Sequence, residues 1–312
     1  MYKGKVLFID TAHPDLTVLL QEMGFECDYF PEYQRVDFLK VINKYVGVVI
    51  RSKLKIDAGF LAQATNLKFI ARVGAGMENI DVAEAEKRNI FCLNAPEGNR
   101  DAVAEQAVGM LLSLFNRLLI ADPEVRNGIW LREQNRGVEL GGKTVGIVGF
   151  GNTGSSFARK LRGFDVKILA YDKYKTGFGN EYVQEAGMGE IYQQADILSF
   201  HVPLTDETTF LFNKEMIDRF KKPFYLINTS RGKVVKTIDL MEAIDQKKVI
   251  GACLDVLEYE GLSFEAIQDS PEFLRLTGMS NVVLSPHIAG WTHESNLKMA
   301  QILAAKVGAL KL

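Results

Sequence analysis

The chain has 312 residues, and its 37 lysines and arginines against 39 aspartates and glutamates give a formal net charge of −2 at pH 7. Nucleic-acid-binding and membrane-surface proteins need a strong basic excess to neutralise phosphates, so this balance argues against both classes. The composition, 47% hydrophobic and 24% charged, is that of an ordinary globular protein, and the length predicts two domains.

No stretch reaches the roughly 18–20 apolar residues that a membrane-spanning helix needs. The three cysteines are widely spaced among apolar residues, and no group of side chains has the spacing of metal ligands. We therefore expect a cytoplasmic protein with buried, reduced thiols, without a disulfide framework and without a metal site. The cysteines are Cys27, Cys92 and Cys253.

In the first part of the chain, short β-rich runs alternate with helical stretches. Near-continuous apolar runs, typical of parallel strands covered on both faces, lie at 5–10, 47–50, 67–71 and 89–93. The longest helical pattern, 102–119, follows a polar stretch at 97–101. We place the domain boundary there, so that the first domain covers residues 1–98.

A second βα series begins at Thr144, and its segments are long enough for right-handed crossovers. A helix is predicted at 155–161, and the helical run after Thr292 is expected to pack back onto the first domain. The second domain therefore covers residues 99–290, and residues 291–312 complete the first. The predicted strands are 145–148, 166–171, 195–200, 224–227, 251–254 and 282–284.

The clearest motif in the second series is a GxGxxG turn formed by Gly149, Gly151 and Gly154. This spacing alone is weak evidence for a nucleotide site, because a plain glycine bend has it too. Here, however, the turn follows a strand and begins a helix, and Asp172 lies at the end of the next strand. That context is the dinucleotide-binding fingerprint. A carboxylate at Asp172 would accept from a ribose 2′-hydroxyl and repel a 2′-phosphate, so NAD is favoured over NADP, although Lys173 beside it weakens that preference.

Polar residues also follow the later strands of this series. His287 comes just after strand 282–284, where it could be a general acid or base or simply a loop histidine. Arg231 follows strand 224–227, where its planar fork suits a substrate carboxylate, although a surface ion pair would fit as well. Three carboxylates, Asp255, Glu258 and Glu260, follow strand 251–254. These strand ends are expected to meet beside a cofactor crevice.

Five motifs in the same order give the chain a resemblance to the D-isomer-specific 2-hydroxyacid dehydrogenases over essentially its whole length. The resemblance implies an α/β fold of two Rossmann-like or flavodoxin-like doubly wound parallel-sheet domains with a cleft between them, NAD as cofactor and a homodimer built on the cofactor domain. The motifs are RVGAGMENID at 72–81, the glycine turn with Asp172, HVPLT at 201–205, NTSRG at 228–232, and LDV at 254–256 with SPH at 285–287.

The resemblance also implies roles for individual residues. His287 is similar to the family's general acid/base, Glu260 to the carboxylate that orients it, and Arg231 to the arginine that binds the substrate carboxylate. Asp255 would contact the nicotinamide carboxamide. The amides of Gly74 and Gly76 would bind the substrate carboxylate, and the residues expected to line the cofactor are Ala75, Asn152, Thr153, Val202, Thr229, Ser230 and Gly290.

The predicted substrate is a small phosphorylated hydroxy acid. Arg51 and Arg72 stand where the family's phosphoglycerate enzymes place arginines that face the substrate phosphate, which predicts oxidation of D-3-phosphoglycerate. Reduction of glyoxylate or hydroxypyruvate is the nearest alternative, because Gly261 replaces the proline that often follows the family's glutamate and residues 261–280 form a long connection. Because the chain ends at Leu312, we expect no feedback inhibition through a C-terminal regulatory domain.

Three other classes of protein share part of this pattern. An NAD-sensing co-repressor of the same family would keep the same three polar residues, so their presence does not exclude it. A formate dehydrogenase is disfavoured because Glu260 is in place. An S-adenosylmethionine enzyme would leave Arg231, Glu260 and His287 without a role.

Overall fold

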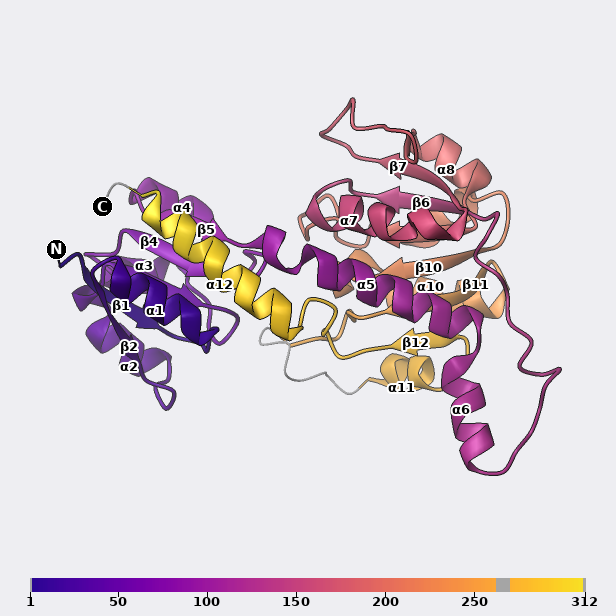
Figure 1. Cartoon of the computed structure of the whole chain (residues 1–312), viewed down its shortest axis with the longest axis horizontal. Coiled ribbons are helices and arrows are strands. Elements are labelled where there is room, and N and C mark those ends of the chain that lie inside the picture. The colour runs from indigo at the N-terminus through magenta and orange to yellow at the C-terminus, as the bar shows by residue number, and fades with distance from the viewer. Residues whose placement is uncertain (1, 262–269, 311–312) are drawn as a thin grey trace. The chain divides into compact units, whose positions relative to one another are not determined.

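The structure is a computed structural model that describes residues 2–261 and 270–310. The chain divides into two compact units. The first comprises Met1–Asn99 and Trp291–Leu312 with a short piece at Gly261, and the second comprises Arg100–Glu260 and Ile267–Gly290. Each unit is an α/β layer structure on a parallel sheet, which confirms the predicted fold class (Figure 1).

The described part of the first unit contains one five-stranded parallel sheet in the order β2-β1-β3-β4-β5. Neighbouring residues of a strand point to opposite faces, so Leu7 and Val48 pack on one side while Val6 and Val49 pack on the other. The strands are β1 (Gly4–Phe8), β2 (Phe25–Tyr29), β3 (Gly47–Ile50), β4 (Phe69–Arg72) and β5 (Phe91–Asn94).

Helices cover both faces of this sheet. One face is covered by α2 (Arg35–Val41), a 3-10 turn η1 (Ile42–Lys44), α3 (Ala58–Gln63) and α4 (Val82–Lys87). The other is covered by α1 (Pro14–Glu22) and α12 (His293–Gly308), which lie side by side as Figure 1 shows for the indigo and yellow helices. The C-terminal helix thus belongs to the core of the first unit.

The described part of the second unit contains a seven-stranded parallel sheet in the order β12-β11-β10-β9-β6-β7-β8. The order reverses between β6 and β9, and ligands bind at such a switch point, at the carboxyl ends of the strands. The strands are β6 (Thr144–Val148), β7 (Lys167–Tyr171), β8 (Gln184–Glu185), β9 (Ile197–Phe200), β10 (Phe224–Asn228), β11 (Val249–Leu254) and β12 (Val282–Leu284).

Two hydrophobic layers sandwich this second sheet. Helices α5 (Pro96–Phe115) and α7 (Asn152–Lys160), with the 3-10 turn η2 (Leu161–Phe164), pack on one face. The other face is covered by α8 (Met188–Gln194), α9 (Lys214–Arg219), η3 (Gly232–Val234), α10 (Thr237–Asp245) and α11 (Pro271–Thr277). Both faces of the sheet are therefore covered, and the loops at its carboxyl edge follow from buried strands.

Two sequence-based expectations need correction. The helix expected at 102–119 begins at Pro96 and ends at Phe115, and α6 (Leu118–Arg126) follows after Arg117, whose φ of 54° is left-handed. Of the three free cysteines, Cys253 is buried, whereas Cys27 and Cys92 are partly exposed.

In the described residues, no single helix is long and apolar enough to cross a membrane; the bent pair α5 and α6 passes that test by length and composition only.

Candidate active site

The glycine-rich turn joins β6 to α7, and packing within the protein explains two of its three glycines. A Cβ on Gly149, whose φ is 94°, would lie 2.6 Å from the carbonyl oxygen of His201, and a Cβ on Gly154 would lie 2.0 Å from that of Gly149. A Cβ on Gly151 would meet no heavy atom within 4 Å. The turn therefore presents open, side-chain-free backbone at the start of α7, beside Asn152 and Thr153, as the close approach of a pyrophosphate requires.

Asp172 braces this turn from the end of β7. Its Oδ2 accepts from the amide of Phe150 at 2.8 Å, and its Oδ1 accepts from the amides of Tyr174 and Lys175, each at 3.0 Å. A carboxylate has about four acceptor positions. Three are occupied, so Asp172 keeps room for about one further donor, such as a ribose hydroxyl.

A cavity of about 380 Å³ opens at the switch point between β6 and β9. Its walls are largely apolar and include a few polar groups, which is typical of a site for a small molecule or a cofactor. Among the predicted cofactor residues, Gly149, Gly151, Asp172 and Val202 line it. The remaining residues that line the cavity are Val148, Tyr171, Lys173, Tyr174, Met188, Tyr192, His201, Pro203, Thr205, Glu207, Thr208, Leu211 and Met216.

His201 forms a neutral wall of this cavity. Burial lowers the pKa of its imidazole to about 3, so the ring is uncharged at physiological pH. Its Nε2 lies 2.9 Å from the Ser199 hydroxyl, and its ring packs against Phe157 with the centroids 5.2 Å apart. A ring with this pKa does not act as a proton donor near neutrality, so the acid/base candidate of this unit is His287.

His287 and Glu260 form a close pair. Nδ1 of His287 lies 2.7 Å from Oε2 of Glu260, and the other carboxylate oxygen of Glu260 accepts from the amide of Leu257. The backbone of His287 is left-handed, with φ of 57°, and its amide donates to the Asp255 carbonyl at 2.7 Å. Strained backbone of this kind occurs at functional sites, where the surroundings hold it in place.

Asp255 anchors the segment that carries His287. Its side chain is buried, and Oδ1 accepts from the Ser285 hydroxyl at 2.6 Å and from the Ile288 amide at 2.9 Å. Oδ2 accepts from the Ala289 amide at 2.8 Å. One carboxylate thus fixes both sides of His287. Its contact with a nicotinamide carboxamide stays a prediction.

Arg231 lies on the loop after β10, next to the loop that carries Glu260. A Cβ on Gly232 would lie 1.9 Å from the Leu257 carbonyl oxygen, so the two loops touch and position 232 must be glycine. The buried Asn228 shapes the Arg231 loop by donating to the Arg231 carbonyl at 2.9 Å. Since β10, β11 and β12 are neighbours in the sheet, Arg231, Glu260 and His287 gather at one edge. Thr229 and Ser230 are buried beside them.

The remaining predicted substrate residues lie together in the first unit. Ile50 of β3 pairs with Arg72 of β4, which brings Arg51 and Arg72 to neighbouring strand ends. The Arg51 guanidinium stacks over Trp291, 4.1 Å from the ring centroid. A Cβ on Gly74 would lie 1.4 Å from Nη1 of Arg72, so the arginine lies across the loop that contains Ala75 and Gly76.

Sequence reasoning missed the residues that hold these groups in place. In the sequence, Ser285, which binds Asp255, is only the first residue of the SPH motif, and no pattern links Trp291 to Arg51. Asp10 was overlooked as well, although its Oδ2 accepts from three successive backbone amides at Arg51, Ser52 and Lys53. A lone aspartate after a strand carries no signal of this role, because its partners are about 40 residues away.

In the part of the chain that the structure describes, no group of three or more His, Cys, Asp and Glu side chains could hold a metal ion.

Comparison with known proteins places this geometry in one family. Residues 108–289 match the model of the D-isomer specific 2-hydroxyacid dehydrogenase NAD-binding domain. A glyoxylate reductase of Thermofilum pendens is 41% identical over 265 residues, which cover 82% of this chain and 75% of the relative. A D-3-phosphoglycerate dehydrogenase of Archaeoglobus fulgidus is 33% identical over 97% of this chain, and the chain spans only 56% of that relative's length.

A solved structure of D-lactate dehydrogenase from Aquifex aeolicus, in complex with NAD and lactic acid, has a TM-score of 0.84 and 27% identity to the chain. The match covers 98% of this chain and 95% of that one. The two-sheet fold of the chain is therefore a known dehydrogenase architecture.

Proposed function

Because the chain belongs to the D-isomer specific 2-hydroxyacid dehydrogenases, a family of NAD-dependent oxidoreductases, we propose that it oxidises D-3-phosphoglycerate to 3-phosphohydroxypyruvate, the reaction that opens serine biosynthesis. The observation that carries the chemistry is the His287–Glu260 pair, 2.7 Å apart, beside the loop of Arg231. Two arginines at neighbouring strand ends of the first unit support the phosphorylated substrate. The proposal also places the enzyme in the cytoplasm, where its three free thiols would stay reduced.

The second unit's cavity, the open backbone at Gly151 and the carboxylate of Asp172 fit NAD. The bound nicotinamide supplies the acceptor for the hydride that leaves the hydroxyl-bearing carbon. His287 removes the hydroxyl proton through Nε2, so that the C–O single bond becomes a carbonyl. Glu260 accepts from Nδ1–H, which fixes the tautomer and stabilises the imidazolium. Arg231 holds the substrate carboxylate through two parallel hydrogen bonds and polarises the forming carbonyl oxygen.

Glyoxylate or hydroxypyruvate reduction is the second candidate, and the 41% identity to a glyoxylate reductase favours it. The same His287, Glu260 and Arg231 would serve either substrate, since both reactions interconvert a hydroxyl and a carbonyl beside a carboxylate. The two candidates differ at the far end of the substrate, where phosphoglycerate carries a phosphate. Steady-state rates on phosphorylated and unphosphorylated acids separate them, with NAD and NADH as cofactors.

Arg51→Ala is expected to lower kcat/KM for D-3-phosphoglycerate by about 10–150-fold, because a hydrogen bond to a charged group contributes about 1.5–3 kcal/mol. The kcat/KM for D-glycerate, which lacks the phosphate, should change by less than about threefold. The matched control is Arg88→Ala, which removes an arginine that pairs with Glu84 of α4. Equal losses on both substrates, or no loss on phosphoglycerate, would show that Arg51 does not bind the phosphate.

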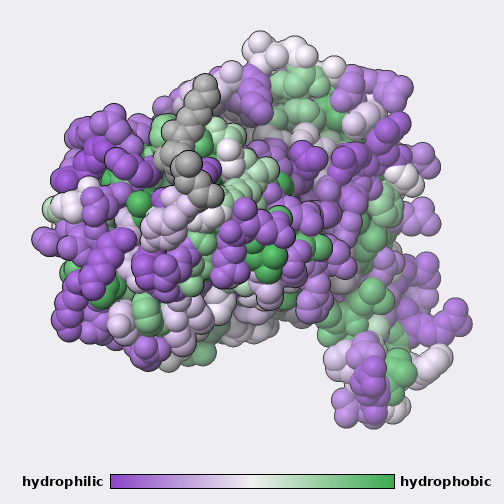
Figure 2. Space-filling model, turned by 60° about the vertical axis from the view of Figure 1, so that its left-hand side comes forward, coloured by the Kyte–Doolittle hydropathy of each residue, from purple (hydrophilic) through white to green (hydrophobic). Residues whose placement is uncertain are grey.

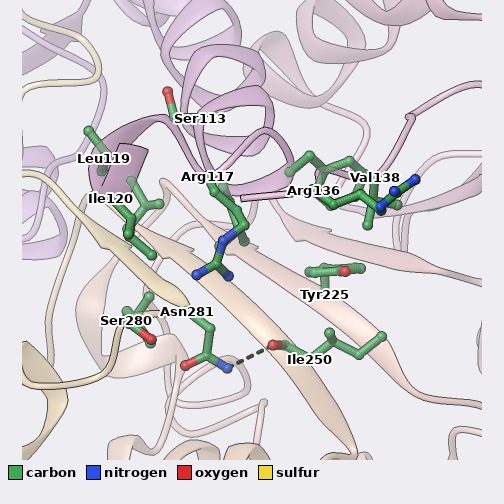
Figure 3. A pocket seen from close by; sticks show the side chains of 14 residues that line it. Ser113, Arg117, Leu119, Ile120, Arg136, Val138, Tyr225, Ile250, Ser280 and Asn281 are labelled. Carbon is green, nitrogen blue, oxygen red and sulfur yellow. Dashed lines mark hydrogen bonds between the residues drawn. The ribbon is translucent and has the colours of Figure 1, made fainter. Parts of the chain in front are cut away.

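We further propose that two copies associate through the second unit. The α6 helix and the loop after it project from that unit (Figure 1), and Figure 2 shows hydrophobic residues in green on the same projection at its lower right. Leu118, Leu119 and Trp130 are 52%, 58% and 74% exposed. Beside them, Arg117 reaches into a pocket of about 160 Å³ between Ile120 and Tyr225 (Figure 3). Exposed apolar surface of this kind marks an interaction site.

Trp130→Glu should convert the dimer to a monomer in sedimentation velocity, because it puts a charge into the proposed contact. Phe91→Glu, at an exposed aromatic residue of the first unit, should leave the dimer intact. A monomeric native chain, or a dimer unaffected by Trp130→Glu, would contradict this arrangement.

A further inference from the structure

Three exposed side chains meet at the rim of the cofactor cavity. Nζ of Lys173 lies 2.7 Å from Oε2 of Glu207, and the hydroxyl of Tyr174 donates to the same oxygen at 2.6 Å. Lys173 and Tyr174 directly follow Asp172 after β7, whereas Glu207 comes from the loop between β9 and α9. All three line the cavity together with Asp172.

From this contact we infer that Glu207 is a specificity-determining residue for the nucleotide: by binding Lys173, it withholds from a ribose 2′-phosphate the cation that such a phosphate would need. The inference concerns the nucleotide alone. It rests on the NAD use of the proposed function and not on which hydroxy acid is the substrate.

The charges at the rim explain why this contact decides between the two nucleotides. NADP differs from NAD by a 2′-phosphate of nearly two negative charges, and sites that accept it supply a cation near the residue at the end of the second strand. Lys173 stands at that place in the sequence. Its ammonium, however, is bound by the Glu207 carboxylate, and Asp172 adds a second negative charge. Asp172, Glu207 and Lys173 together carry a net charge of −1, so a 2′-phosphate would meet an excess of negative charge at the rim.

The protonation states at the rim agree with this view. The hydrogen bond to Glu207 raises the pKa of Lys173, and the hydrogen bonds from Lys173 and Tyr174 lower the pKa of Glu207. The pair is thus fully ionised across the physiological range. A second cation, Lys175, lies nearer to the glycine turn, with Nζ 3.5 Å from the Phe150 carbonyl oxygen. Its position beside the turn suits the pyrophosphate, which the two nucleotides share.

Calorimetric titration with NAD⁺ and NADP⁺ tests the inference without any substrate. Glu207→Gln should tighten NADP⁺ binding by about five- to thirtyfold, since two unit charges 4 Å apart in water interact by about 1 kcal/mol and the phosphate carries nearly two. NAD⁺ binding should change by less than about twofold. Adding Lys173→Ala to Glu207→Gln should remove the gain, because the released lysine is its source.

Two controls separate this effect from a general change in surface charge. Glu181→Gln removes another exposed carboxylate, which pairs with Arg162 away from the cavity, and should leave both affinities unchanged. Lys175→Ala should weaken NAD⁺ and NADP⁺ binding by the same factor. The gain from Glu207→Gln should also shrink as salt is raised, since the groups are exposed.

An unchanged ratio of NADP⁺ to NAD⁺ affinity in Glu207→Gln, including no detectable NADP⁺ binding, would overturn the inference. So would a gain that survives the loss of Lys173. Either result would leave the assignment of His287 and Arg231 untouched, because nucleotide binding is measured here without hydride transfer.

Discussion

His287→Asn is expected to lower kcat for oxidation of a D-2-hydroxy acid by about 10²–10⁴-fold, the usual contribution of a general acid or base. Asparagine is the right replacement because His287 has a left-handed backbone, with φ of 57°. Asparagine tolerates that conformation better than alanine does, so the loop held by Asp255 should keep its shape. The loss then reports the missing proton acceptor and not a displaced loop.

Initial rates with NAD⁺, together with calorimetric NAD⁺ affinity, check this result. The affinity should stay within about twofold of that of the native protein, since the imidazole acts on the substrate. His293→Asn, at an exposed position that begins α12, serves as the matched control and should retain full activity. A His287→Asn protein with more than about a tenth of the native kcat would remove His287 from the proton-transfer step.

Arg231→Lys is the second change with a large expected effect. Lysine keeps the charge but loses the planar fork that holds a carboxylate through two parallel bonds. Each charge-assisted bond contributes about 1.5–3 kcal/mol, so kcat/KM should fall by about 10–150-fold. In Arg231→Gln, which loses the charge as well, kcat/KM should be lower still. The loop itself should persist, because Asn228 binds the Arg231 carbonyl and not its side chain.

The comparison of Arg231→Lys with Arg219→Lys shows whether the loss belongs to the site. Arg219 is exposed on α9, where it pairs with Glu215, and its replacement should leave the kinetics unchanged. If Arg231→Lys has the kcat/KM of the native protein on every 2-hydroxy acid tested, the arginine does not bind the substrate carboxylate.

The sequence predicted the buried strands of both sheets closely because each is a continuous apolar run. Strand β3 at 47–50 and strand β12 at 282–284 have the predicted bounds. Strand β2 was missed because it lies at the edge of its sheet, where FECDY mixes buried and exposed residues. Strand β8 has only two residues, and no periodicity can show a strand that short.

Helix ends were harder to predict because long-range contacts set them. The polar composition of 97–101 predicted a helix that begins only at Ala102, yet these residues form the first turns of α5. There a Cβ on Gly98 would lie 2.6 Å from the Met299 side chain, and the Asp101 carboxylate accepts from the Ser156 hydroxyl at 2.6 Å. The break between α5 and α6 at Arg117 could not be predicted, because the sequence has neither a glycine nor a proline at that position.

In the candidate site, too, the local features could be predicted from the sequence and the long-range contacts could not. The glycine turn could be predicted because strand, turn and helix are consecutive in the chain, and the polar strand ends because parallel strands share one edge. What the sequence alone could not show is which side chains pair with one another in each unit. Glu207 with Lys173, and Trp291 with Arg51, lie 34 and 240 positions apart in the chain, and only folding brings them together.

The formation of NADH from the D and L isomers of a panel of 2-hydroxy acids, phosphorylated and unphosphorylated, tests the central claim most directly. We expect NADH only from D isomers, with the highest kcat/KM on D-3-phosphoglycerate and loss of the signal in His287→Asn. Tight NAD⁺ binding without NADH formation from any D-2-hydroxy acid would contradict the account and would favour a protein that senses NAD instead of using it.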